Sequence, residues 1–213
     1  FEQNAALTPI STTYQDNLTH SLVRQDRFRM IERTRLDMIL REQKLSRTEL
    51  INRDTALRVG QLAAAHGIVT GSIIESRTGL EIVARFIDTE TSEILSTVDV
   101  YDEAKDLSGL RGLAEGMALK FHRDFPLLSG MVVQTKGEEV ITDLGKDKLG
   151  AQRRLIVYRE TPVKHPVTGK TLGEDNVIVG FARITQIMPK MSKAEVSGVR
   201  EGPVQGLDRV ITQ

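Results

Sequence analysis

The chain has 213 residues, a length that suits one large domain or two small ones, and its 29 basic residues balance 29 acidic residues. The charge is uneven, with 15 Lys and Arg against 18 Asp and Glu in residues 1–122, and 14 against 11 in residues 123–213. Neither half has the strong basic excess of a dedicated nucleic-acid-binding protein, and the lack of cysteine excludes disulfides, thiolate zinc sites and thiol nucleophiles.

No apolar run approaches the roughly 18 residues that a membrane-spanning helix needs. The sequence begins at Phe1 rather than Met, and it opens without the charged-then-apolar pattern of a signal peptide. We therefore expect a trimmed or processed form whose targeting signal or lipid anchor would lie upstream.

The first quarter of the chain predicts two helices separated by a strand. Residues 1–11 indicate the end of a strand followed by a loop, with Pro9 as the breaker. Apolar residues four apart predict an amphipathic helix over residues 13–24, and alternating charged and apolar residues predict a strand over residues 27–32. A second helix is expected to begin at a Thr34 cap and to lead into a polar connection.

Residues 54–74 predict the helix and central strand around which the first domain is organised. Asp54 is a natural N-cap, and a stripe of small residues on one helical face allows close packing on a sheet. The stripe consists of Ala56, Val59, Gly60 and Ala63. The pair His66-Gly67 is expected to end the helix, with Gly67 in the left-handed conformation. The uncharged, β-branched run over residues 68–74 predicts a strand buried on both faces.

The next stretch predicts a hairpin and a long helix. Residues 80–88 alternate with apolar side chains on one face, and residues 93–101 form the return strand after a short polar turn. A helical period then runs from Leu107 until Pro126 stops it. Helices and strands in this order predict an α/β (α+β) sandwich with a mixed sheet over residues 1–125.

The composition changes after Phe125-Pro126, where short strand-like runs and Gly-rich turns replace the helical periods. Residues 126–196 predict a small antiparallel β-barrel or β-sandwich domain. Its expected strands cover residues 131–135, 140–143, 155–158, 177–184 and 185–188, and a turn-rich hairpin tip covers residues 162–173. A mixture of Gly, Pro and Gln predicts a flexible tail over residues 197–213.

The sequence offers no convincing catalytic or metal site. The four histidines are scattered, whereas a metal site needs converging ligands. Gly169-Lys170-Thr171 resembles the end of a phosphate-binding loop, but Lys164 stands where the full pattern needs a glycine, and neighbouring prolines indicate a hairpin. We therefore predict no enzyme activity, no cofactor and no metal.

Basic residues are concentrated in the middle of the second domain. They are Lys146, Lys148, Arg153, Arg154, Arg159, Lys164 and Lys170. If the loops converge, these side chains make a basic edge that could meet an acidic partner protein or an anionic envelope polymer, while a solvated face of alternating charge is the other interpretation. The residues expected to bind a partner are Lys146, Lys148, Arg153, Arg154, Lys164 and His165. An oligonucleotide suits this region less well, because Tyr158 is its one aromatic residue.

Three segments of the first domain resemble the CsgG family, in the same order along the chain. Residues 27–45 include Arg-Phe-Arg-Met-Ile-Glu-Arg and the later run Leu-Asp-Met-Ile-Leu-Arg-Glu-Gln-Lys-Leu. Residues 54–72 resemble the family's helix and buried strand, which end in Gly-Ser. Residues 85–91 are similar to its hairpin, although Ser92 stands where Gly is usual. The domain is also similar in plan to the amino-terminal domain of TolB.

The second domain resembles the carboxy-terminal domain of the flagellar assembly protein FlgT, through residues 140–145, 157–159 and 166–173. FlgT carries the same kind of α/β domain before it, so both the pair and its order match. The resemblances imply a non-catalytic assembly or scaffold protein of the bacterial cell envelope, of the curli-secretion or flagellar-assembly type. They imply a periplasmic or outer-membrane-associated location and contacts with other envelope proteins, and they leave a homo-oligomer open because the CsgG family assembles into rings.

A membrane pore and a different function are the remaining alternatives. CsgG itself forms a secretion channel, which needs added hairpins with strands of roughly 10 alternating residues. The connections here are short, so we expect no pore and no membrane-spanning segment from this chain. The alternative function is an envelope-polymer or small-ligand binding module that uses the basic edge of the β domain. Salt-dependent association with an anionic polymer, abolished by charge reversal at Arg153 and Arg154, would favour that module over a scaffold.

Overall fold

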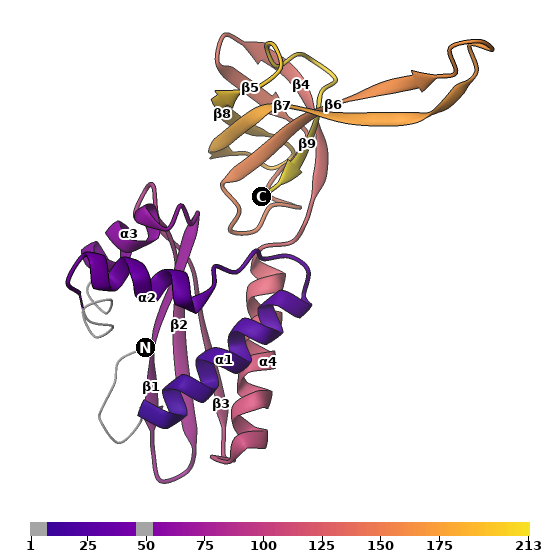
Figure 1. The fold of residues 1–213 in the computed structure, drawn as a ribbon. Helices are drawn as coiled ribbons and strands as arrows, with labels where there is room; N and C mark the ends of the chain where they lie inside the picture. Colours follow the sequence, from indigo (N-terminus) through magenta and orange to yellow (C-terminus); the bar gives the residue numbers. More distant parts are fainter. Residues whose placement is uncertain (1–7, 46–52) are drawn as a thin grey trace. The chain divides into compact units, whose positions relative to one another are not determined.

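The computed structural model describes residues 8–45 and 53–213, and the chain divides into two compact units, residues 1–124 and 125–213 (Figure 1). The first unit contains α1 (Thr8–Arg24), α2 (Arg33–Glu42), α3 (Arg53–Leu62), β1 (Gly67–Glu75), β2 (Leu80–Asp88), β3 (Ile94–Asp102) and α4 (Leu107–Asp124). The second unit contains β4 (Ser129–Lys136), β5 (Glu139–Thr142), β6 (Arg154–Lys164), β7 (Thr171–Ile187), β8 (Ser192–Val199) and β9 (Arg209–Thr212). The strand expected to end near residue 1 lies outside the described residues.

The first unit packs helices on a three-stranded antiparallel sheet in the order β1-β2-β3. Helix α4 lies against β3, and α1 packs along α4 (Figure 1). Alternate residues of β2 lie on the face of the sheet that the helices cover, and Leu80, Ile82 and Ala84 are fully buried there. The core of the unit includes Leu80, Ile82, Ala84, Val98, Tyr14, Leu18, Leu22, Leu110, Met117 and Phe121. The predicted fold class, an α/β layer followed by an antiparallel β domain, is confirmed.

The sheet differs from the prediction in one respect, since all three described strands are antiparallel rather than mixed. Residues 28–32, expected within a strand, are irregular. The Phe28 ring lies 6.2 Å from the Phe86 ring, centroid to centroid, so an apolar side chain packs this segment near β2 without strand pairing. Glu32 precedes α2 with extended backbone angles, and the Thr34 hydroxyl donates to its carboxylate at 3.3 Å, so the predicted Thr34 cap is wrong.

The starts of α1 and α3 show why local signals mislead by a few residues. Pro9, predicted as a breaker, lies in the first turn of α1, where a helix has no use for the amide that proline lacks. Asp54, predicted as the cap of α3, lies inside its first turn. The predicted stripe of α3 is buried as expected, and a Cβ added at Gly60 would lie 2.5 Å from the Thr89 methyl group. Gly60 therefore allows the helix to approach the end of β2 closely.

The end of α3 and the strand that follows differ from the prediction. The helix stops at Leu62, and Ala64 rather than Gly67 has the left-handed backbone, with φ of +53°. Gly67 instead begins β1, where a Cβ would lie 2.3 Å from the Phe86 ring. Strand β1 is half-buried rather than enclosed, with Ile73 its one fully buried residue, because among the described strands it pairs with β2 alone.

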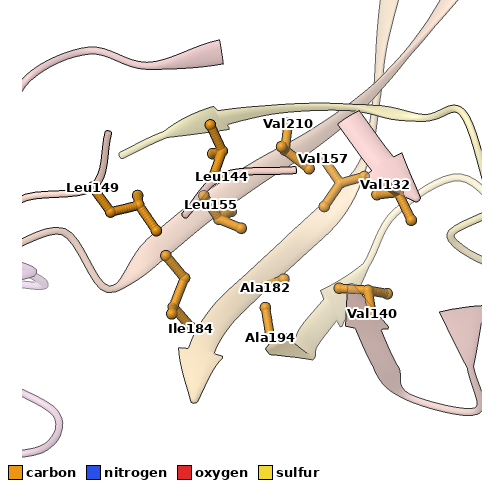
Figure 2. Packing of buried hydrophobic residues seen from close by; sticks show 10 residues of the cluster. All are labelled: Val132, Val140, Leu144, Leu149, Leu155, Val157, Ala182, Ile184, Ala194 and Val210. Carbon is orange, nitrogen blue, oxygen red and sulfur yellow. The ribbon is translucent and has the colours of Figure 1, made fainter. Parts of the chain in front are cut away.

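The second unit is a closed antiparallel barrel in the order β4-β5-β8-β7-β6-β9. Figure 2 shows the apolar side chains that fill its interior, and alternation along β6 places Leu155 and Val157 inside. The ten residues of this core are Val132, Val140, Leu144, Leu149, Leu155, Val157, Ala182, Ile184, Ala194 and Val210. All six strands contribute residues to this core. The core is therefore complete only when the ring of strands is closed.

The flexible tail predicted over residues 197–213 is wrong, because this segment completes the barrel. Strand β9 pairs with both β4 and β6, and Val210 is fully buried. The Thr212 hydroxyl donates to the Pro126 carbonyl at 2.9 Å and accepts from the Leu128 amide at 2.9 Å. The last residues of the chain thus tie the first residues of the unit into the ring.

Candidate functional site

The predicted basic residues lie in two separate groups rather than along one edge. Arg154 is paired with Arg183 at the barrel end of the β6–β7 hairpin, and Lys164 is paired with Thr171 near its tip. Ten residues of extended strand span about 33 Å. Lys164 and His165 therefore lie far from the other four residues expected to bind a partner.

The group at the barrel end forms a cationic rim without a deep pocket. Lys146 and Lys148 are exposed on the loop after β5, and the Lys146 amide donates to the Met188 carbonyl at 2.9 Å. Arg153, half-buried before β6, lines an open hollow of about 230 Å³ with residues 184–187. Sites for small molecules usually have volumes of about 300–1,000 Å³, so this hollow suits a surface contact better than a small ligand.

Arg159, counted among the basic residues in the sequence, is neutralised by a buried partner. Its Nε donates to Asp208 Oδ1 at 2.6 Å and its second nitrogen donates to Oδ2 at 2.8 Å. The Asp208 side chain is 3% exposed and also accepts from the Gln205 amide at 2.8 Å. Hydrogen bonding to Asp208 raises the pKa of the Arg159 guanidinium, while partial burial acts in the opposite direction. The pair fastens β6 to the loop before β9, at the point where β6 leaves the barrel.

Beyond this point β6 and β7 continue as a two-stranded ribbon, which we call the arm and define as residues 160–176 (Figure 1). Every residue of the arm is exposed except His165, which is half-buried in the tip turn. His165 Nδ1 accepts from the amides of Val167 and Thr168 at 3.2 Å each. The predicted 162–173 tip is therefore shorter, and the His165 ring holds the turn through these two hydrogen bonds. The expectation that His165 binds a partner stays a prediction.

The arm displays features that the sequence reasoning missed. Val163, Val167 and Leu172 are 45%, 87% and 65% exposed, although they are aliphatic. Glu174 and Asp175 follow on β7, where Gly173 and the acidic pair interrupt any simple strand pattern. The sequence carried no signal for these exposed side chains. Their placement follows from the continuous pairing of β6 with β7, which is visible only in the structure.

Three other kinds of site were considered from the sequence: a metal site, a phosphate-binding loop and a membrane-spanning helix. Within residues 8–45 and 53–213, no group of three or more His, Asp or Glu side chains is placed to hold a metal ion. Gly169-Lys170 lies in the tip turn between two strands, where the predicted hairpin interpretation holds and no helix follows as in a phosphate-binding loop. None of the helices described is long and apolar enough to cross a membrane.

Comparison with known families places a similarity in the first unit. A family model described as curli production assembly/transport component CsgG matches residues 2–80, which contain α1, α2, α3 and β1 and end at the first residue of β2. The predicted resemblance of the first domain to the CsgG family is thus supported over these residues. The match does not extend into the barrel unit, where the resemblance to FlgT stays a prediction. No curated protein matches the sequence of the chain.

Proposed function

We propose that this chain is a non-catalytic assembly component of the bacterial cell envelope that works through contacts with other proteins. The observation that carries the proposal is the match of residues 2–80 to the CsgG assembly and transport component. The layered first unit, with helices packed on a three-stranded sheet, is compatible with such a role. We place the protein in the periplasm or at the outer membrane, as the family similarity suggests.

The barrel unit supports the same proposal through its shape. The arm extends from the closed barrel and its residues are exposed, so it offers surface for contacts with other proteins. Exposed strand edges are a common means of protein recognition. A small β domain after an α/β domain is also the plan that we predicted from the resemblance to FlgT. We therefore treat the two units as successive contact modules of one scaffold.

The test is photocrosslinking of the full-length protein in its native cells, followed by fractionation. A photoreactive residue replaces Met38 on α2 or Leu119 on α4, which are 56% and 58% exposed. We expect the protein in the envelope fraction and discrete crosslinks to envelope proteins from at least one position. Recovery in the cytosolic fraction, or light-independent products alone from both positions, would contradict the proposal.

A second candidate function is binding of an anionic envelope polymer at the cationic rim. The observation that favours it is the placement of Lys146 and Lys148 on a loop bonded to Met188, next to the hollow that Arg153 lines. Heparin serves as the probe, in titrations at low and high salt. We expect Arg153→Glu to weaken salt-sensitive binding, whereas the matched control Lys164→Glu makes the same charge change about 33 Å away and leaves it intact. An equal loss of heparin binding in both variants would mean that binding depends on net charge and not on the cationic rim.

A further inference from the structure

The arm carries exposed apolar side chains at its far end. Val163, Val167 and Leu172 are 45%, 87% and 65% exposed, and Val167 is the most exposed large apolar side chain among the described residues. Lys164 lies six residues beyond Tyr158, the last residue of β6 that pairs with β9, and six residues of extended strand span about 20 Å. The arm therefore holds three aliphatic side chains clear of the barrel (Figure 1).

Positive charge surrounds these aliphatic side chains, and negative charge begins only behind them. Residues 161–173 contain two exposed lysines, Lys164 and Lys170, and no acidic residue. The acidic residues of the arm all lie nearer the barrel, and they are Glu160, Glu174 and Asp175. A surface that approaches the tip therefore meets positive charge first, and this order of charges favours an anionic partner.

The tip turn satisfies its own backbone amides. His165 Nδ1 accepts from the amides of Val167 and Thr168. The His165 amide donates to the Lys170 carbonyl at 2.8 Å, and the Lys170 amide donates to the Thr168 hydroxyl at 3.4 Å. The amide of residue 169 donates to the His165 carbonyl at 2.9 Å, and residue 166 is a proline without an amide. All amides of residues 165–170 are thus bonded within the turn, as a segment that enters a layer poor in water requires.

The composition of the tip suits a lipid surface better than a groove on a protein. The side chains that contribute most to protein interfaces are those of Trp, Tyr and Arg, and the arm contains none of them. Aliphatic residues beside lysines are typical of segments that lie on an anionic membrane. There the lysine stem lies among apolar groups while its ammonium group stays in water near the lipid phosphates.

The spacing along the arm fits the depth of such a contact. Glu174 is paired with Pro162, and three residues further along β6 the His165 amide bonds to Lys170 at the start of the turn. Three residues of strand span about 10 Å. A segment at a membrane surface places its apolar groups about 5–10 Å into the boundary between headgroups and acyl chains. The tip therefore fits this layer as far as the acidic pair, whose charge opposes deeper insertion.

We propose that the tip of the arm inserts into the surface of an anionic phospholipid membrane. Val163, Val167 and Leu172 enter the boundary between headgroups and acyl chains, and Lys164 and Lys170 contact the lipid phosphates. The tip enters one leaflet and does not span the membrane. The inference goes beyond the proposed function, because the contact needs no envelope protein and its failure would leave the crosslinking result untouched.

Fluorescence from a single labelled cysteine tests insertion, since the chain contains no cysteine. Val167→Cys in the full chain carries a dye whose emission depends on polarity, and vesicles of phosphatidylglycerol and phosphatidylcholine in equal parts are added. We expect a blue shift of the emission and quenching by nitroxide-labelled lipid. The matched control is Val133→Cys, at a position 62% exposed on β4 of the barrel, which should show neither change. An unchanged spectrum at position 167, or equal shifts at both positions, would overturn the proposal.

Cosedimentation with the same vesicles separates the apolar and charged parts of the contact. Val167→Ser should weaken association about tenfold, because it removes apolar area from the contact and keeps the backbone hydrogen bonds of the turn. Lys164→Gln and Lys170→Gln should each weaken association about fivefold and reduce its dependence on salt. Val133→Ser, the same change on the barrel, should stay within about twofold of the original. Association that needs both lysines but not Val167 would indicate an anionic partner other than lipid, such as an acidic protein, and would overturn the proposal.

Discussion

Replacement of Arg159 by methionine tests the anchor at the base of the arm. Methionine keeps an apolar stem of similar length but removes the guanidinium that binds Asp208 through two hydrogen bonds of 2.6 and 2.8 Å. The Asp208 carboxylate is 3% exposed and keeps the Gln205 amide as a donor at 2.8 Å. In the variant the buried Asp208 carboxylate loses both hydrogen bonds from Arg159 and keeps the one from Gln205.

The expected cost follows from the burial of the two partners. Breaking a fully buried ion pair costs about 3–5 kcal/mol, because the remaining charge is left uncompensated. Arg159 is 33% exposed, so water can reach the carboxylate once the guanidinium is gone. We therefore expect the unfolding free energy of the barrel unit to fall by about 2 kcal/mol.

The assay is urea unfolding of the full chain, followed by far-UV circular dichroism. Leu155→Ala, which empties a fully buried position of the barrel core, identifies the transition of the barrel unit by lowering it about 2–5 kcal/mol. Arg159→Lys is the matched control for charge, and it should recover part of the loss without the two-bond geometry. An Arg159→Met variant within about 0.5 kcal/mol of the original protein would refute the reasoning.

Three further predictions concern single side chains. Val210→Ala, at a fully buried position of β9, should lower the unfolding free energy of the barrel by about 2 kcal/mol in the same assay, whereas a flexible carboxy terminus would show no change. Leu207 is 77% exposed and has a left-handed backbone with φ of +75°, which is unfavourable for a residue with a Cβ. Leu207→Gly should therefore stabilise the barrel by about 0.5–1 kcal/mol, and a loss of stability would mean that the Leu207 side chain makes packing contacts. Burial raises the pKa of the Tyr14 phenol, so the unfolded state loses this proton first. The unfolding free energy of the first unit should fall above about pH 10, by up to about 1.4 kcal/mol per pH unit, and Tyr14→Phe should flatten that fall.

Elements with a long and regular pattern could be predicted from the sequence. The bounds of β2 agree with the predicted residues 80–88, and the predicted apolar face is buried at Leu80, Ile82 and Ala84, until a register shift between Phe86 and Ile87 breaks the alternation. Helix α4 shows the predicted buried period through Leu110, Met117 and Phe121, although Leu107 at its start is 72% exposed. In both elements the local pattern and the tertiary packing agree over most of the length and diverge at one end.

Elements defined by distant partners could not be predicted. Strand β9 has four residues, too few for a periodic signal, and it follows a loop rich in Gly and Pro. Its position depends on β4 and β6, more than 50 residues earlier in the chain. The predicted basic edge failed for the same reason, because Asp208 removes Arg159 from it and the length of the hairpin separates Lys164 from Arg153.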